Sequence, residues 1–199
     1  MTNQLVGGAK PGPDSTQLSV EQPRSIPDEL PVVRALIPVI KGDRMDVCVE
    51  KLVEVGVDAI TIWPAARAVV KLVGSRRASR LEHYRGIAQA AARQSGRASV
   101  PSVAMVDSLG AALAGLPAGR HLVLDPGVDQ PLAETLSAAA ASISDPITII
   151  TGPEGGLARE ELDQLIGAGF SPVGLGPRVL RAETAPVVAV ALIRAASKS

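Results

Sequence analysis

Cysteine is almost absent from this chain, which has Cys48 alone among 199 residues. A single cysteine excludes an intrachain disulfide and a metal site built from clustered cysteines. Cys48 shares helical spacing with Met45, Val49 and Leu52, so we expect it in the core, with a reactive thiol as the alternative. The sequence therefore predicts no metal centre.

Aromatic residues and net charge are also lacking. The chain has one tryptophan, one tyrosine and one phenylalanine, fewer than proteins that bind single-stranded nucleic acid mainly by base stacking. Twenty basic residues balance twenty acidic ones, so the formal net charge is zero. Any anionic partner must therefore be met by a local cationic patch.

Long apolar runs are missing as well. No segment reaches the length that crosses a membrane, and the N-terminus lacks the basic region and apolar core of a secretory signal. Apolar residues still make up 46% of the chain, which is ordinary for a globular protein. We expect a soluble, cytoplasmic protein without membrane association.

The first 31 residues differ in composition from the rest. Residues 1–31 are rich in proline, glycine, serine and glutamine and show little apolar periodicity. They are interpreted as a flexible arm, with an irregular leader of no function as the alternative. Residues 32–199 are expected to form one domain.

Strand-like and helix-like segments alternate from Val32 onward. The expected strands are Val32–Ile40, Ala59–Trp63, Val103–Val106, His121–Leu124, Pro146–Ile150 and Pro172–Leu175. The expected helices are Asp43–Val55, Ala78–Ser95, Leu109–Leu116, Leu132–Ala141, Glu160–Gly167 and Ala185–Ala196, with Thr184 able to cap the last one. This alternation predicts an α/β fold with a mostly parallel sheet.

The stretch Ile147–Leu157 is the most informative part of the chain. Its apolar, β-branched start ends abruptly in the turn TGPEGG, and a helical pattern follows. A buried strand that opens into a glycine-rich turn is how parallel sheets build ligand sites at their carboxyl edge. The segment LGPRVLRAETA, at residues 175–185, repeats this scheme. An ordinary tight turn is the alternative for the first motif taken alone.

Three expected strand ends converge at this edge. The loops are Leu124–Pro126, Thr151–Gly156 and Leu175–Leu180. They predict an apolar cleft lined by backbone amides and carbonyls, suited to a neutral or cationic ligand with an adenine ring. Neither a phosphate-binding loop ending in Gly-Lys-Ser/Thr nor a G-x-G-x-x-G turn after the first strand is present, which argues against a nicotinamide dehydrogenase.

TGPEGG followed by LGPRVLRAETA resembles the SPOUT superfamily of RNA methyltransferases, and within it the 16S ribosomal RNA uridine-N3 methyltransferase family. The upstream segments 41–45, 50–57, 67–71 and 94–97 agree with that family in order and rough spacing. The resemblance covers about Val32 to the C-terminus. The family's usual N-terminal barrel of the PUA type is expected to be lacking here, with the arm in its place.

The resemblance implies an α/β domain with a C-terminal trefoil knot, S-adenosylmethionine as cofactor, and a homodimer. It also implies ribosomal RNA or the small ribosomal subunit as partner, and hence a role in ribosome biogenesis. The implied cofactor-binding residues are Leu124, Asp125, Pro126, Gly152, Pro153, Glu154, Gly155, Gly156, Leu175, Gly176, Val179 and Leu180. Glu154 could face the cofactor or only brace its turn.

Methyl transfer to N3 of uridine requires in-line alignment and loss of the N3 proton. Arg181 is suited to stabilising negative charge on the uracil carbonyls. Glu183 could orient that arginine or act as a base, and Thr184 could donate a hydrogen bond. Helix capping and packing are the alternatives for these three residues.

Four residues are candidates for binding RNA: Arg67, Arg93, Gln94 and Arg97. Arg93 and Arg97 are four residues apart, so we expect them on one helical face. Cations there could contact phosphates, whereas a solvated helix face is the alternative.

The sequence thus predicts a methyltransferase that uses S-adenosylmethionine to modify N3 of a uridine in small-subunit ribosomal RNA. One alternative is a related methyltransferase with another RNA target or a 2′-hydroxyl acceptor. The other is a catalytically weak relative that binds cofactor or RNA.

Overall fold

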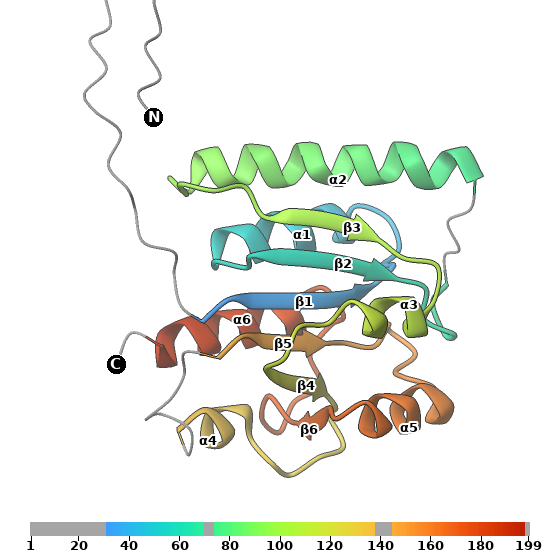
Figure 1. Ribbon diagram of the computed structural model, residues 1–199, viewed down its shortest axis with the longest axis vertical. Coiled ribbons are helices and arrows are strands. Elements are labelled where there is room, and N and C mark those ends of the chain that lie inside the picture. The colour runs from blue at the N-terminus through green and yellow to red at the C-terminus, as the bar shows by residue number, and fades with distance from the viewer. Residues whose placement is uncertain (1–30, 70–73, 138–144, 198–199) are drawn as a thin grey trace, which may run out of the picture.

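The computed structural model describes residues 31–69, 74–137 and 145–197 (Figure 1). The expected arm, residues 1–31, therefore lies outside the described residues except for its last position. The end of the expected helix at 132–141 also lies outside them, from residue 138 onward.

The described chain forms a six-stranded sheet in the order β3-β2-β1-β5-β4-β6. Every pairing in the sheet is parallel, so the expected parallel α/β architecture is confirmed. The strands are β1 (Val33–Pro38), β2 (Ala59–Trp63), β3 (Ser102–Met105), β4 (Arg120–Leu124), β5 (Ile147–Ile150) and β6 (Ser171–Val173).

A helix occurs at each place where the sequence predicts one. The helices are α1 (Arg44–Glu54), α2 (Gly74–Gln94), α3 (Leu109–Ala114), α4 (Leu132–Ser137), α5 (Arg159–Gly167) and α6 (Thr184–Ala196). The largest difference in their starting points is at α2, which begins at Gly74 rather than Ala78.

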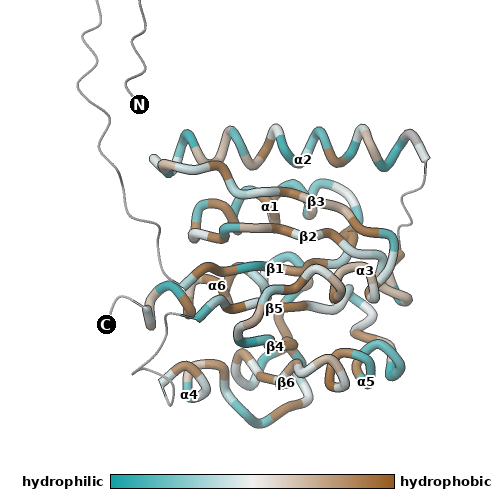
Figure 2. The backbone as a smooth tube through the Cα atoms, viewed as in Figure 1, coloured by the Kyte–Doolittle hydropathy of each residue, from teal (hydrophilic) through white to brown (hydrophobic). Residues whose placement is uncertain are grey.

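Helices cover both faces of the sheet, and each face has its own apolar cluster. Helices α1, α2, α4 and α6 contribute to one cluster, and α3 and α5 to the other. In β5, Ile147 and Ile149 belong to the first cluster and Ile150 to the second, as the alternation of a strand requires. Figure 2 shows apolar stretches in the strands and hydrophilic stretches along α2 and α5. Strands buried on both faces explain the near-continuous apolar run at 147–150.

The connections at the carboxyl edge lie close together. Gly174, just after β6, donates its N–H to the Gln130 carbonyl at 2.8 Å, and its own carbonyl accepts from Leu132 at 2.9 Å. A Cβ at Gly174 would lie 2.7 Å from the Val128 carbonyl oxygen, so only glycine permits this approach. The chain leaving β4 is therefore tied to the chain leaving β6. The trefoil knot stays a prediction.

The last helix is fixed to the rest of the domain by a buried arginine. Arg194, on α6, donates to the carbonyls of Gly56 at 2.9 Å and Pro31 at 2.8 Å. It also forms an ion pair with Asp58 at 2.6 Å. These bonds join the C-terminal helix to the start of the first strand and to the turn that precedes β2.

Replacement of Arg194 by leucine is expected to destabilise the protein strongly. The change leaves the half-buried Asp58 without its closest cation and two carbonyls without a donor. Asp58 keeps its pair with Arg97 at 3.3 Å, so the expected cost is that of buried carbonyls left without a donor, about 1–3 kcal/mol in the free energy of unfolding. Urea denaturation followed by circular dichroism measures this loss. Arg159→Leu is the control, because Arg159 is 86% exposed on α5; an equal midpoint for both variants would contradict the role of Arg194.

Candidate active site

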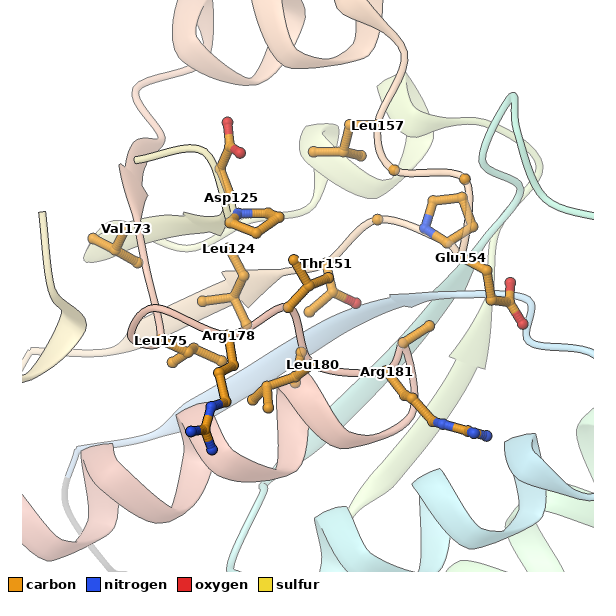
Figure 3. A pocket seen from close by; sticks show the side chains of 18 of the residues that line it. Leu124, Asp125, Thr151, Glu154, Leu157, Val173, Leu175, Arg178, Leu180 and Arg181 are labelled. Carbon is orange, nitrogen blue, oxygen red and sulfur yellow. The ribbon is translucent and has the colours of Figure 1, made fainter. Parts of the chain in front are cut away.

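A cavity of about 630 Å³ opens at the carboxyl edge of β4, β5 and β6 (Figure 3). Its walls are the three loops that follow these strands, as the sequence predicts. All twelve residues expected to bind the cofactor line the cavity. The structure thus brings the expected residues together, and their individual roles in binding stay predictions.

Besides Arg181, several lining residues lie outside the three loops predicted to line the cavity. They are Arg44, Leu157, Leu162, Val173, Ala182 and Ala185, whereas Thr151 and Arg178 belong to the predicted loops. Most of them closely follow or precede a predicted loop in sequence, and this proximity was the available signal that they line the cavity. Arg44 is different, because it begins α1, far from these loops in sequence. Its segment, residues 41–45, is one of those that resemble the family, which was the available signal, but that resemblance does not by itself indicate a place in the cavity.

The turn after β5 folds tightly on itself. Gly156 donates its N–H to the Pro153 carbonyl at 2.8 Å. A Cβ on Gly152 would lie 2.9 Å from the Leu157 nitrogen, a distance that real Cβ atoms do not reach. Glycine at 152 is therefore a condition for the turn to close, which explains the composition of this loop.

One buried hydroxyl group in the cavity wall is unpaired. Thr151 is 2% exposed, and its Oγ1 has no hydrogen-bond partner. Buried polar groups nearly always form hydrogen bonds, so an unpaired hydroxyl in a cavity wall is suited to bond with a polar group of a ligand. Asp125, in the loop after β4, instead accepts from the Gly127 N–H at 2.9 Å and so braces its own loop.

The TGPEGG turn has external support. Arg67 donates to the Gly155 carbonyl at 3.2 Å, and a Cβ at Gly155 would lie 3.2 Å from the Cβ of Arg67. Glu161 accepts from the N–H groups of Ala66 at 2.7 Å and Ala158 at 2.8 Å. Arg67, expected to bind RNA, therefore lies against the turn. The Glu161 carboxylate thus caps the N-terminus of α5 and also binds the chain that follows β2.

The candidate catalytic residues differ in placement. Arg181 lines the cavity and its side chain is 77% exposed, whereas Glu183 is 12% exposed and lies 4.0 Å from Arg181. Glu154 and Arg181 extend toward the same end of the cavity (Figure 3). Thr184 is exposed and is not among the lining residues.

The expected capping role of Thr184 is wrong. The N-cap position of α6 is Glu183, and no side chain forms a capping hydrogen bond there. Thr184 is the first residue of the helix, where its backbone N–H donates to the Arg181 carbonyl at 2.9 Å.

Cys48 lies in the core, as predicted. It is fully buried, and burial raises the pKa of its thiol to about 12, with a further contribution from the charge of Glu183. The thiol is therefore protonated at neutral pH and is not a nucleophile.

The other RNA-binding candidates do not form one group. Arg93 and Gln94 are exposed at the end of α2, which runs from the carboxyl edge of β2 to the amino edge of β3. The expectation that Arg93 and Arg97 share a helical face is wrong, because α2 ends at Gln94. Arg97 instead donates to the carbonyls of Val53 and Val57 and pairs with Asp58 at 3.3 Å. The Arg97 guanidinium therefore forms its hydrogen bonds and its ion pair within the domain.

Within the described ranges, no group of three or more histidine, cysteine, aspartate or glutamate residues is arranged to hold a metal ion. No helix in the same ranges is long and apolar enough to span a bilayer.

Comparison with known proteins gives consistent matches. The family model for the RNA methyltransferase domain matches residues 28–194. Ribosomal RNA small subunit methyltransferase E of Mycobacterium bovis is 34% identical over 173 residues, which cover 85% of this chain and 65% of the relative. The Bacillus subtilis protein of the same name is 35% identical over 157 residues, 77% of this chain and 61% of the relative.

The fold is similar to that of a solved relative. Ribosomal RNA small subunit methyltransferase E from Neisseria gonorrhoeae, bound to S-adenosylmethionine, superposes with a TM-score of 0.71 at 36% identity. The match covers 82% of this chain and 65% of that one, so the chain spans slightly less than two thirds of the length of these relatives. The sheet order, the cavity between the three loops and the family match agree, and the chain belongs to the RNA methyltransferase domain family, in the SPOUT superfamily.

Proposed function

We propose that this protein transfers a methyl group from S-adenosylmethionine to RNA, at N3 of a uridine in small-subunit ribosomal RNA. The cavity at the carboxyl edge carries the proposal, because it is built by the two glycine motifs that resemble the family's cofactor loops. The names of the relatives support ribosomal RNA as the substrate class.

The cavity fits S-adenosylmethionine in size and chemistry. Its volume of about 630 Å³ falls within the range of about 300–1,000 Å³ that is usual for small-ligand sites. Leu124, Leu157 and Leu175 offer apolar contact for an adenine ring, and the unpaired Thr151 hydroxyl offers a hydrogen bond. The cofactor-bound Neisseria relative supports this choice of ligand.

When bound, S-adenosylmethionine supplies an electrophilic methyl group on a sulfonium. Arg181, at the mouth of the cavity, stabilises the negative charge that develops on the uracil carbonyls as the N3 proton leaves. Glu183, 4.0 Å from Arg181, orients that guanidinium or accepts the proton. Thr184, exposed at the start of α6, donates a hydrogen bond to the RNA in this proposal.

Exposed polar side chains contribute affinity for the RNA backbone, Arg67 and Arg93 as cations and Gln94 as a neutral hydrogen-bond donor. Arg93 and Gln94 are exposed at the end of α2 and can reach phosphates. Arg67 is exposed beside the TGPEGG turn, where an RNA contact would act directly on the cofactor loop. Arg97 is left out of this surface because of its internal hydrogen bonds.

A methyl-transfer assay on purified small ribosomal subunits, followed by mass spectrometry of the nucleosides, tests the proposal. We expect N3-methyluridine as the product. A different methylated nucleoside would favour another RNA target or a 2′-hydroxyl acceptor. Cofactor binding by calorimetry without any methylated nucleoside would favour a relative that binds but does not catalyse.

We also propose a homodimer that acts in the cytoplasm. One face of α6 is apolar, with Val188 half-buried and Ala191, Leu192 and Ala195 exposed. These positions follow the i, i+3, i+4, i+7 spacing of a helix that packs against a partner. A second copy of this chain would bury that face.

Leu192→Asp is expected to convert the dimer into a monomer. Leu192 is 37% exposed within the apolar face, and a carboxylate there would be buried without a cation in the dimer. Sedimentation velocity measures the change in mass. Ile166→Asp is the control, because Ile166 is a 50% exposed apolar residue on a different helix. A dimer that survives Leu192→Asp would place the interface elsewhere.

A further inference from the structure

Arg44 connects two carboxylates that come from different loops of the cavity. Its guanidinium lies 3.0 Å from Glu154, in the TGPEGG turn, and 3.8 Å from Glu183, at the start of α6. Arg44 itself begins α1 and lines the cavity. One side chain therefore links the turn after β5, the segment that carries Arg181, and the helix that follows β1.

Glu183 is shared between two arginines. Its side chain is 12% exposed, and its Oε2 is buried without a hydrogen-bond partner. Arg44 lies 3.8 Å from Oε2, and Arg181 lies 4.0 Å from Oε1. Both distances exceed hydrogen-bond length, so neither arginine is held tightly by this carboxylate.

We propose that Arg44 is a positioning residue that acts through Glu183 on Arg181. The inference rests on the proposed function, in which Arg181 meets the uracil. While Arg44 balances part of the Glu183 charge, the 77% exposed Arg181 extends toward the substrate. Without Arg44, Arg181 is the one cation of the described residues that remains paired with Glu183, and it is drawn back to that carboxylate.

The contact with Glu154 suggests a competing role, in which Arg44 only fixes the cofactor loop. The two roles differ in what they change. Loss of loop support weakens binding of S-adenosylmethionine. Withdrawal of Arg181 lowers kcat for methyl transfer and leaves cofactor affinity nearly unchanged.

Arg44→Gln in the full chain separates these roles. We expect kcat to fall on the order of tenfold, the size of coupling usual between neighbouring charged residues. The calorimetric Kd for S-adenosylmethionine is expected to stay within about twofold, and Arg44→Lys, which keeps the positive charge but not the two-pronged geometry, is expected to restore part of kcat. Arg159→Gln is the matched control, since Arg159 pairs with Asp163 at 3.8 Å on the surface of α5. A weakened Kd with unchanged kcat would overturn the proposal in favour of loop support.

A double-mutant cycle tests the route through Glu183. In a Glu183→Gln background, Arg44→Gln is expected to cause no further loss of kcat, because the charge that Arg44 balances is gone. An undiminished effect in that background would overturn the proposal. Thermal melting of each variant confirms that the comparison is made between folded proteins.

The side-chain NMR signal of Arg181 gives a readout that does not depend on catalysis. Arg44→Gln is expected to shift the Arg181 Nε–H resonance as the pair with Glu183 tightens, and addition of Glu183→Gln is expected to reverse the shift. An Arg181 resonance that is identical in the wild type and in Arg44→Gln would overturn the inference. Absence of methyl transfer by the wild type would instead contradict the proposed function, and the resonance would still decide the role of Arg44.

Discussion

Gly152→Ala is expected to weaken binding of S-adenosylmethionine by about 5- to 150-fold, measured by calorimetry. The added Cβ would lie 2.9 Å from the Leu157 nitrogen and 3.1 Å from the carbonyl carbon of Gly156. Both atoms are backbone, so the turn must open to admit the methyl group. Strain of this kind costs about 1–3 kcal/mol, which corresponds to that range of affinity.

Gly86→Ala is the control for this prediction. Gly86 lies in α2, and a Cβ there has no heavy atom within 4 Å. The change is expected to leave cofactor affinity unaltered and to raise stability by up to about 1 kcal/mol, because alanine is the better helix former. Equal affinity of Gly152→Ala and the wild type would mean that the TGPEGG turn does not form the cofactor site.

Arg181→Ala is expected to lower kcat for methyl transfer by about 10²- to 10³-fold, the usual loss when one group that stabilises transition-state charge is removed. The exposed guanidinium is at the mouth of the cavity, and its closest acidic neighbour, Glu183, is 4.0 Å away. It is therefore available to the uracil rather than held by an internal ion pair. Single-turnover assays on small subunits measure the chemical step.

Cofactor binding separates this role from a structural one. The Kd of Arg181→Ala for S-adenosylmethionine is expected to change no more than a few-fold, since Arg181 is at the rim of the cavity. Arg159→Ala, an exposed arginine of α5, is expected to leave both kcat and Kd unaltered. A large loss of cofactor affinity with unchanged kcat would show that Arg181 belongs to the cofactor site alone.

The sequence was sufficient for the elements and for the loops of the cavity. Apolar periodicity located every strand and helix of the described chain to within a few residues, because burial on one or both faces imposes a period that is visible locally. Parallel pairing then places the ends of β4, β5 and β6 at one edge. The glycines of TGPEGG carry a further local signal, since a turn this tight excludes a Cβ at Gly152.

The sequence was less informative about where charged side chains go. Arg93 and Arg97 have the spacing of a helical pair, yet the helix ends between them, and Arg97 turns inward to Val53, Val57 and Asp58. Long side chains reach several partners from one backbone position, so their periodicity does not identify which partner they meet. Arg67 is a second example: its long side chain donates to the Gly155 carbonyl in the TGPEGG turn, a partner that its position in the sequence does not indicate.

The sequence by itself therefore determined the α/β class, the order of the elements, the buried Cys48 and the three loops that form the cavity. Only the tertiary structure decided that Arg44 reaches Glu154 and Glu183, and that Arg194 joins α6 to Asp58. Local patterns follow from the repeat of the backbone and the burial of apolar faces. Ion pairs between residues more than a hundred positions apart depend on how whole elements pack, which no local pattern contains.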